Sequence, residues 1–169
     1  MASPLVLLKT AVFSVLVPGT VAGLVPQLLA RRDRLALPIE PRVARVAGSA
    51  SLLAGLSLYL HTARRFSDEG SGTPSPSDEP SELVTGGVYG SVRNPMYLAV
   101  LCCIGGQALL YRSVLVCWWA VGCWLGFHNR ILEYEEPHLA AKHGEEYERY
   151  RERVPRWLPR PARDATSLD

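Results

Sequence analysis

A positive charge and an amide stand at the start of an apolar segment. Arg93 and Asn94 directly precede Pro95, and no charged residue follows until Arg112. Asparagine is a favoured N-cap and proline a favoured first helical residue, so a helix is predicted to begin here. The free N–H groups of its first turn, together with the Arg93 guanidinium, indicate a site for an anion. The alternative is a capped helix whose arginine simply lies at the level of lipid headgroups.

A second set of polar residues follows the next apolar segment. Segments 95–111 and 113–129 are nearly equal in length and meet at a short polar turn, so they predict a tight antiparallel hairpin. The hairpin returns the chain to the level of Arg93 and Tyr97. The returning polar residues are His128, Asn129, Arg130, Glu135 and Glu136. Together they could bind a zwitterionic ligand with a carboxylate, an ammonium and a ribose. The alternative for the acids is a solvated helix start.

These residues must be positioned by apolar helices. Four windows contain no Asp, Glu, Lys or Arg: 10–30, 46–63, 95–111 and 113–129. Each is close to the ~20 residues that a helix needs to cross a hydrocarbon core. The sequence therefore predicts an all-α integral membrane bundle of about four transmembrane helices.

The first window is interrupted by residues that would break a soluble helix. These are Pro18, Gly19, Gly23 and Pro26. A membrane helix tolerates such residues where neighbours bond the freed backbone groups. A cleaved signal peptide is the alternative for this window.

Composition divides the chain into four parts. Residues 1–65 are predicted to hold two N-terminal helices, and 66–86 a flexible loop rich in Ser, Pro, Gly and acids. Residues 87–160 hold the hairpin and a C-terminal segment, and 161–169 form a tail. The positive-inside rule favours a cytoplasmic location for both termini and the site, although five arginines within 31–45 argue for the reverse.

The C-terminal segment has the pattern of a pair of amphipathic helices. Pro137 fits the first turn of one helix, and Gly144 fits a break before the next. Partly apolar residues recur at steps of three or four, namely Leu139, His143, Tyr147, Tyr150 and Val154. We expect this segment to pack on the cytoplasmic mouth of the hairpin.

Composition argues against other classes of function. A formal net charge of +2 is too small to indicate nucleic-acid binding. The four cysteines lie inside apolar windows without disulfide or zinc spacing, and His138 and His143 belong to no metal motif. No metal and no nucleic acid are therefore expected.

Two motifs resemble the signatures of the isoprenylcysteine carboxyl methyltransferase and phospholipid methyltransferase group. The first, G-x-Y-x-x-x-R-[HN]-P-x-Y, consists here of Gly87, Tyr89, Arg93, Asn94, Pro95 and Tyr97. The second is an acidic pair, a Leu, a Gly–acid–x–Tyr–x–x–Tyr and a closing V-x-R-W-x-P. It consists here of Glu135, Glu136, Leu139, Gly144, Glu145, Tyr147, Tyr150, Val154, Arg156, Trp157 and Pro159. The resemblance covers about 84–160, with Pro155 taking up the extra position before Arg156.

The resemblance implies a multi-pass methyltransferase of a bacterial or archaeal membrane that uses S-adenosylmethionine. Its cofactor pocket would open to the cytoplasm, and a lipophilic acceptor would arrive from the bilayer: an isoprenylcysteine-like carboxylate, a phospholipid amine or a small thiol. The cofactor-binding positions it implies are Tyr89, Arg93, Asn94, Pro95, Tyr97, His128 and Glu136. Arg130 and Glu135 would lie nearer the reacting centre.

Asn94 departs from the histidine that many relatives carry. An amide cannot titrate, so no general base can stand at this position. Two alternatives remain open. One is an NADPH-dependent membrane enone or sterol reductase with a similar C-terminal hairpin, and the other is a non-catalytic membrane scaffold.

Overall fold

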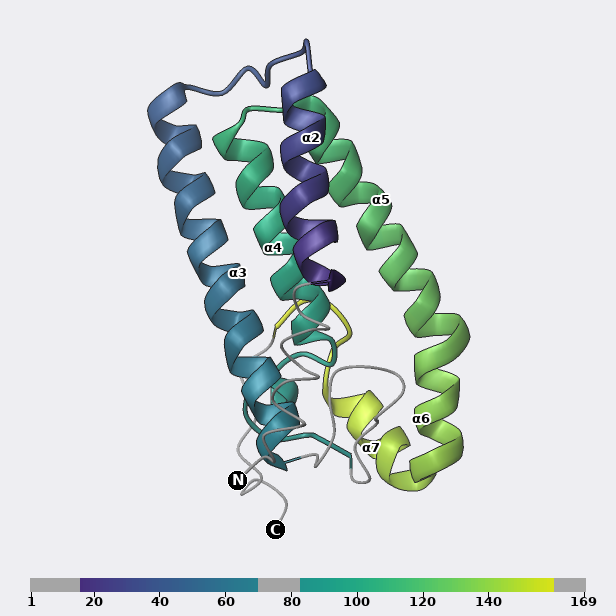
Figure 1. The fold of residues 1–169 in the computed structure, drawn as a ribbon. Coiled ribbons are helices and arrows are strands. Elements are labelled where there is room, and N and C mark those ends of the chain that lie inside the picture. The colour runs from purple at the N-terminus through teal and green to yellow at the C-terminus, as the bar shows by residue number, and fades with distance from the viewer. Residues whose placement is uncertain (1–15, 70–82, 160–169) are drawn as a thin grey trace.

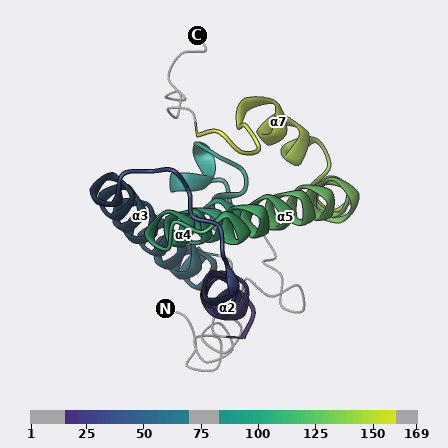
Figure 2. The same ribbon diagram turned by 90° about the horizontal axis from the view of Figure 1, so that it is seen from above.

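A computed structural model describes residues 16–69 and 83–159, and these residues form helices and no β-strand. The long helices run alternately up and down the molecule, and the short C-terminal helices gather at one end (Figure 1). The elements are η1 (Thr20–Leu24), α2 (Val25–Arg32), α3 (Pro41–Glu69), η2 (Gly87–Gly90), α4 (Pro95–Leu110), α5 (Val114–Arg130), η3 (Ile131–Glu135), α6 (Glu136–His143) and α7 (Glu145–Arg153). Seen from above, α3, α4 and α5 form a row, with α2 on one side and α7 on the other (Figure 2).

Helices α3 and α4 approach each other through small residues. A Cβ atom on Gly48 would lie 2.8 Å from the carbonyl oxygen of Gly106, and one on Gly55 would lie 2.7 Å from that of Ala99. Ser51 Oγ donates to the carbonyl of Cys102 at 2.9 Å across the same seam. Such close backbone contact through Gly, Ala and Ser is typical of helix pairs in membranes, where packing replaces the hydrophobic effect.

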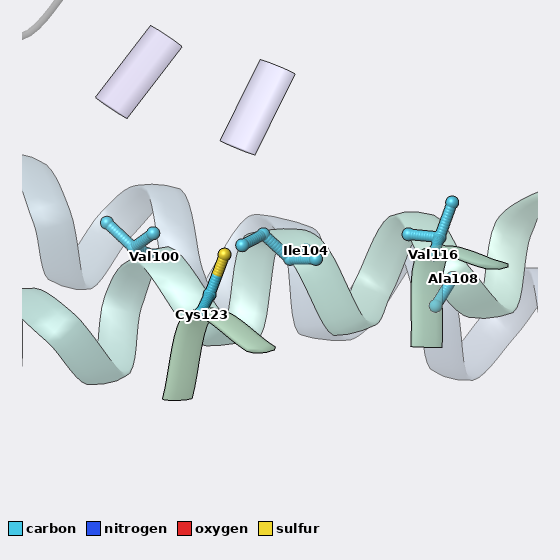
Figure 3. Packing of buried hydrophobic residues seen from close by; sticks show 5 residues of the cluster. All are labelled: Val100, Ile104, Ala108, Val116 and Cys123. Atoms are coloured by element: carbon cyan, nitrogen blue, oxygen red, sulfur yellow. The ribbon is translucent and has the colours of Figure 1, made fainter. Parts of the chain in front are cut away.

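An apolar core joins α4 to α5 and to the N-terminal helix. Its buried members are Val100, Ile104, Ala108, Val116 and Cys123 (Figure 3). Residues of the continuous N-terminal helix formed by η1 and α2 pack against them, namely Val21, Ala22 and Leu29.

Pro26 explains why the N-terminal helix widens into the π-turn η1. Proline has no N–H and its ring clashes with the carbonyl four residues earlier, here that of Ala22. In the wider turn the carbonyl of Ala22 accepts from Gln107 Nε2 instead, and that of Val21 accepts from Trp119 Nε1 at 2.9 Å. Neighbouring helices thus bond the freed groups, as expected for this window.

The connection between α2 and α3 is tied to the turn between α4 and α5. Asp33 accepts from Ser113 Oγ at 2.5 Å and from the Leu115 amide at 2.8 Å, so it caps α5 together with Ser113. Leu37 N donates to the carbonyl of Arg112 at 2.7 Å. These contacts hold the end of the bundle that lies away from α6 and α7 (Figure 1).

One described helix is long and apolar enough to cross a membrane, namely the part of α3 from Pro41 to Arg65. Helix α4 is apolar but shorter. Helix α3 continues to Glu69, beyond the helix end predicted near Arg65, so the first residues of the predicted 66–86 loop are helical. The predictions for 1–15, 70–82 and 160–169 lie outside the described residues.

Candidate active site

Glu136 is a buried carboxylate held by two arginines. Arg93 Nη1 lies 2.8 Å from Glu136 Oε1, and the Arg156 guanidinium donates Nε to Oε1 and Nη2 to Oε2, each at 2.8 Å. The side chains of Arg93 and Glu136 are only 10% and 11% exposed. Burial alone would raise the pKa of Glu136, but the hydrogen bond from Arg156 and the charge of Arg93 outweigh it and lower that pKa. Glu136 is therefore ionised and fully committed to its own chain.

Glu135 belongs to a second, more open group. Its Oε1 accepts from Tyr97 Oη at 2.5 Å and from Arg130 Nε at 2.9 Å. The Tyr97 ring stacks on Phe127 with 4.6 Å between centroids, which fixes the direction of its hydroxyl. Arg130 and Glu135 are 43% and 27% exposed. This group can therefore meet a ligand without breaking the buried pair behind it.

The π-turn η3 explains how adjacent glutamates serve two different groups. In an α-helix, residues five apart point about 140° away from each other, since each residue turns the helix by about 100°. The i→i+5 turn of Ile131–Glu135 returns Glu135 beneath Arg130, while Glu136 opens α6 toward Arg93. Pro137 follows directly and cannot donate to the carbonyl of Glu133, so the widened turn has the same local cause as η1.

The segment after α7, residues 154–159, closes the site over the start of α4. The Arg93 amide donates to the Pro155 carbonyl at 2.9 Å, and Asn94 Nδ2 donates to the Arg156 carbonyl at 3.2 Å. Tyr150 Oη donates to the carbonyl of Tyr89 at 2.8 Å, and both rings are buried. The start of α4 and the segment after α7 therefore form one hydrogen-bonded unit.

This unit changes the predicted roles of Arg93 and Asn94. Asn94 is the N-cap residue of α4, but its side chain accepts no capping hydrogen bond from the described residues. It donates instead to the C-terminal segment. The charge of Arg93 is taken up by Glu136, so the anion site predicted from Arg93 and the helix start is occupied by a carboxylate of the chain itself.

His128 lies between two tryptophans. Trp157 Nε1 donates to His128 Nδ1 at 3.2 Å, and the His128 ring stacks on Trp124 with 5.5 Å between centroids. Because Nδ1 accepts, the neutral imidazole carries its proton on Nε2 and can donate there. Trp157 and Trp124 approach to 6.3 Å between centroids. The three rings give the site an aromatic wall.

The sequence-predicted site residues thus divide by location. Arg93 and Tyr97 contact the two glutamates, Arg130 pairs with Glu135, and His128 lies in the aromatic wall. Tyr89 is buried in η2, and Pro95 is buried as the first residue of α4.

Three residues that contact these groups were absent from the predicted site, namely Arg156, Trp157 and Trp124. The first two stand in the closing V-x-R-W-x-P motif, whose residue types could have indicated them. No sequence signal marks Trp124 as a site residue. A tryptophan one turn before His128 in an apolar helix could equally face lipid.

The donor set favours an organic ligand. No group of three potential metal-binding side chains occurs among the described residues. A carboxylate, a guanidinium, a phenol and an imidazole lie beside aromatic faces, and aromatic faces attract cations. Such a set suits a ligand with several hydrogen-bonding groups and a positive charge.

The fold and this site define a helical protein that gathers polar side chains where one apolar helix, α4, begins and its antiparallel partner, α5, ends. Residues 43–146, more than half of the chain, match the model of the phospholipid methyltransferase family. The chain belongs to this family.

Curated relatives point to the same group. The chain is 37% identical over 78 residues to protein-S-isoprenylcysteine O-methyltransferase of Schizosaccharomyces pombe, which covers 46% of the chain and 33% of that protein. It is 37% identical over 83 residues to protein-S-isoprenylcysteine O-methyltransferase B of Arabidopsis thaliana, covering 48% of the chain and 42% of that protein. The human protein-S-isoprenylcysteine O-methyltransferase is 40% identical over 78 residues, covering 46% of the chain and 27% of that protein. The matched segment thus spans less than half the length of each relative.

Proposed function

We propose that this protein transfers a methyl group from S-adenosylmethionine to a lipophilic acceptor within the membrane. The observation that carries the proposal is the joining of the two motifs into one site, with Arg93 on Glu136 and Tyr97 on Glu135. Family membership supports the reaction class, and the names of the relatives support a prenylated cysteine carboxylate as acceptor.

The same proposal places the protein in a bilayer as a bundle of about four spans. Large apolar side chains remain exposed on α2, α3 and α5, including Leu53 and Trp118 at 65% and 68%. Charged residues are absent from 46–63, 95–110 and 114–129. Water would penalise such a surface, whereas lipid tails would cover it. We propose that the end bearing α6 and α7 faces the cytoplasm.

The residues fit the groups of the cofactor. Arg130 can bind its carboxylate, Glu135 its ammonium or ribose hydroxyls, and His128 Nε2–H an acceptor atom of the adenine or ribose. The faces of Tyr97, Trp124 and Trp157 suit the flat base and the positive sulfonium. We assign Arg93, Asn94, Glu136, Tyr89 and Pro95 to the wall that holds these groups in place.

The bound cofactor would supply an electrophilic methyl carbon on a sulfonium. The protein's contribution is to hold the acceptor in line with that carbon and to exclude water, because positioning dominates such a displacement. A carboxylate acceptor attacks without losing a proton. A thiol or amine acceptor must lose one, and Glu135 is placed to accept it.

Cofactor binding tests this proposal most directly. Radiolabelled S-adenosylmethionine should bind the purified protein in detergent, with Glu135→Gln weakening binding at least tenfold. Glu133→Gln is the matched control, since this exposed acid lies in the same π-turn outside the predicted site. Binding of NADPH instead would identify a reductase, and binding of neither would leave a scaffold.

The acceptor requires a separate assay. Purified protein should methylate a farnesylated cysteine with a free carboxylate faster than phosphatidylethanolamine in the same vesicles. Methylation of the phospholipid alone would retain the reaction class and overturn the acceptor.

A further inference from the structure

The end of the bundle away from α6 and α7 carries a group of exposed arginines. The stretch from Arg31 to Arg45, which ends α2, connects it to α3 and begins α3, contains five exposed arginines: Arg31, Arg32, Arg34, Arg42 and Arg45. Its two acids are engaged elsewhere: Asp33 caps α5, and Glu40 Oε2 accepts from the Val43 amide at 2.8 Å at the start of α3. Among the described side chains, those of residues 16–65 and 83–159, no carboxylate forms an ion pair with any of these arginines.

One of these arginines borders a hollow. This hollow is open to the surroundings, has a volume of about 310 Å³ and is lined by Gln27, Ala30, Arg31 and Tyr111. Ala30 and Arg31 lie three and four residues after Gln27 on one side of α2, and Tyr111 is the C-cap residue of α4. Guanidinium, amide and phenol groups all donate hydrogen bonds, and the guanidinium fork matches phosphate geometry. The volume suits a headgroup rather than a whole lipid.

An apolar track leads from the hollow along the helix. Leu24 and Leu28 lie seven and three residues before Arg31, on the same face of the helix, and are 53% and 41% exposed. A free phosphate ion would gain nothing from these leucines, whereas acyl chains would cover them. Tyr111, 47% exposed, is the type of residue that lies at headgroup level.

We propose that this hollow binds the phosphate of an anionic phospholipid, with its acyl chains lying along α2. The proposal rests on the membrane placement proposed above but not on methyl transfer. Its place at the opposite end of the bundle separates it from the acceptor and the cofactor (Figure 1).

Native mass spectrometry of the full chain released from detergent tests the lipid preference. Phosphatidylglycerol should remain bound at concentrations at least tenfold below those needed for phosphatidylcholine, and inorganic phosphate in large excess should not displace it. Arg31→Gln and Gln27→Ala should each weaken phosphatidylglycerol retention about three- to tenfold. Arg42→Gln is the matched control, because it removes an arginine from the same end but outside the hollow, and it should leave retention unchanged within twofold.

Each other outcome counts against the proposal. Equal retention of the two lipids, or equal loss in all three variants, would contradict a specific site. Displacement by inorganic phosphate would identify a small-anion site instead. Lipid retention is measured without cofactor or acceptor, so its failure is distinguishable from failure of the methyltransferase proposal. Extraction of the protein from membranes by alkaline carbonate would show that the membrane placement itself is wrong.

Discussion

Tyr97 Oη donates a hydrogen bond of 2.5 Å to Glu135 Oε1, although the two residues lie thirty-eight positions apart in the sequence. This bond connects the first turn of α4 to the π-turn after α5. Arg130 approaches the same carboxylate from the preceding turn. The positions of Tyr97 and Arg130 therefore depend on each other, because both side chains donate to the same oxygen of Glu135.

Replacing Tyr97 by Phe isolates this contact. The variant keeps the ring on Phe127 but loses the hydroxyl, so Glu135 keeps only Arg130 among the described partners. A hydrogen bond to a charged group contributes about 1.5–3 kcal/mol, so we expect cofactor affinity to fall about 10- to 100-fold. The melting temperature should also fall, because this hydrogen bond is present without the cofactor. Tyr134→Phe, at a tyrosine that is 48% exposed, is the control, and an equal loss there would contradict a specific role for Tyr97.

The buried ion pair predicts a large effect on stability. Glu136→Gln leaves Arg93 and Arg156 without their counter-charge, and breaking a buried pair costs about 3–5 kcal/mol. Thermal unfolding in detergent should report a clear loss. Glu146→Gln, which changes an exposed acid on α7, should unfold with the wild type. Equal stability of the two variants would mean that the pair contributes nothing.

The lowered pKa of Glu136 sets the sign of a pH effect. In the unfolded chain this carboxyl titrates near 4.5, and in the folded protein its pKa is lower. Folding therefore gains stability above the unfolded pKa and loses it as the pH falls through the folded pKa. The melting-temperature difference between wild type and Glu136→Gln should stay constant from about pH 6 to 8 and shrink below about 4.5. A difference that grows on acidification would contradict this assignment.

Asn94→Asp separates two roles of the asparagine. Aspartate is an equally good N-cap, so a capping role predicts unchanged or higher stability. The structure gives Asn94 a donor role toward the Arg156 carbonyl, which a carboxylate cannot fill. We expect faster hydrogen exchange and proteolysis of residues 154–159 in this variant. Unchanged protection of that segment would favour the capping role.

Gly55→Ala tests the close contact of α3 and α4. The added methyl would lie 2.7 Å from the Ala99 carbonyl, so the helices must separate, and we expect a loss of about 1–3 kcal/mol. Gly122→Ala is the matched control on α5, where a Cβ meets nothing within 4 Å. That change should be neutral or stabilise the protein by up to about 1 kcal/mol. Denaturation in detergent measures both.

Helix positions could be predicted from the sequence because apolar windows and Asn-Pro starts are local signals. Helix α4 begins at Pro95 and α5 ends at Arg130, close to the predicted limits. The seam of Gly48, Gly55 and Gly106 was not predicted, since small residues within an apolar window resemble any other apolar residues there.

The site was harder to predict than the helices. Hairpin length alone was enough to bring Arg93 and Tyr97 to the level of Glu135 and Glu136. The π-turn decides which residue each glutamate contacts, because it changes the direction in which the two side chains point. This change cannot be deduced from a 3.6-residue periodicity. The pairing of Arg156 with Glu136 depends on a return of the chain after α7 that no local pattern encodes.

The hydrogen bonds from Arg93 and Asn94 to residues 155 and 156 also determine when the site can form during synthesis of the chain. During synthesis the start of α4 is complete long before these carbonyls leave the ribosome. Until then Glu136 lacks its hydrogen bonds from Arg156, and His128 lacks the hydrogen bond from Trp157. The site can therefore be completed only after translation has passed Trp157, when α3, α4 and α5 have already been made.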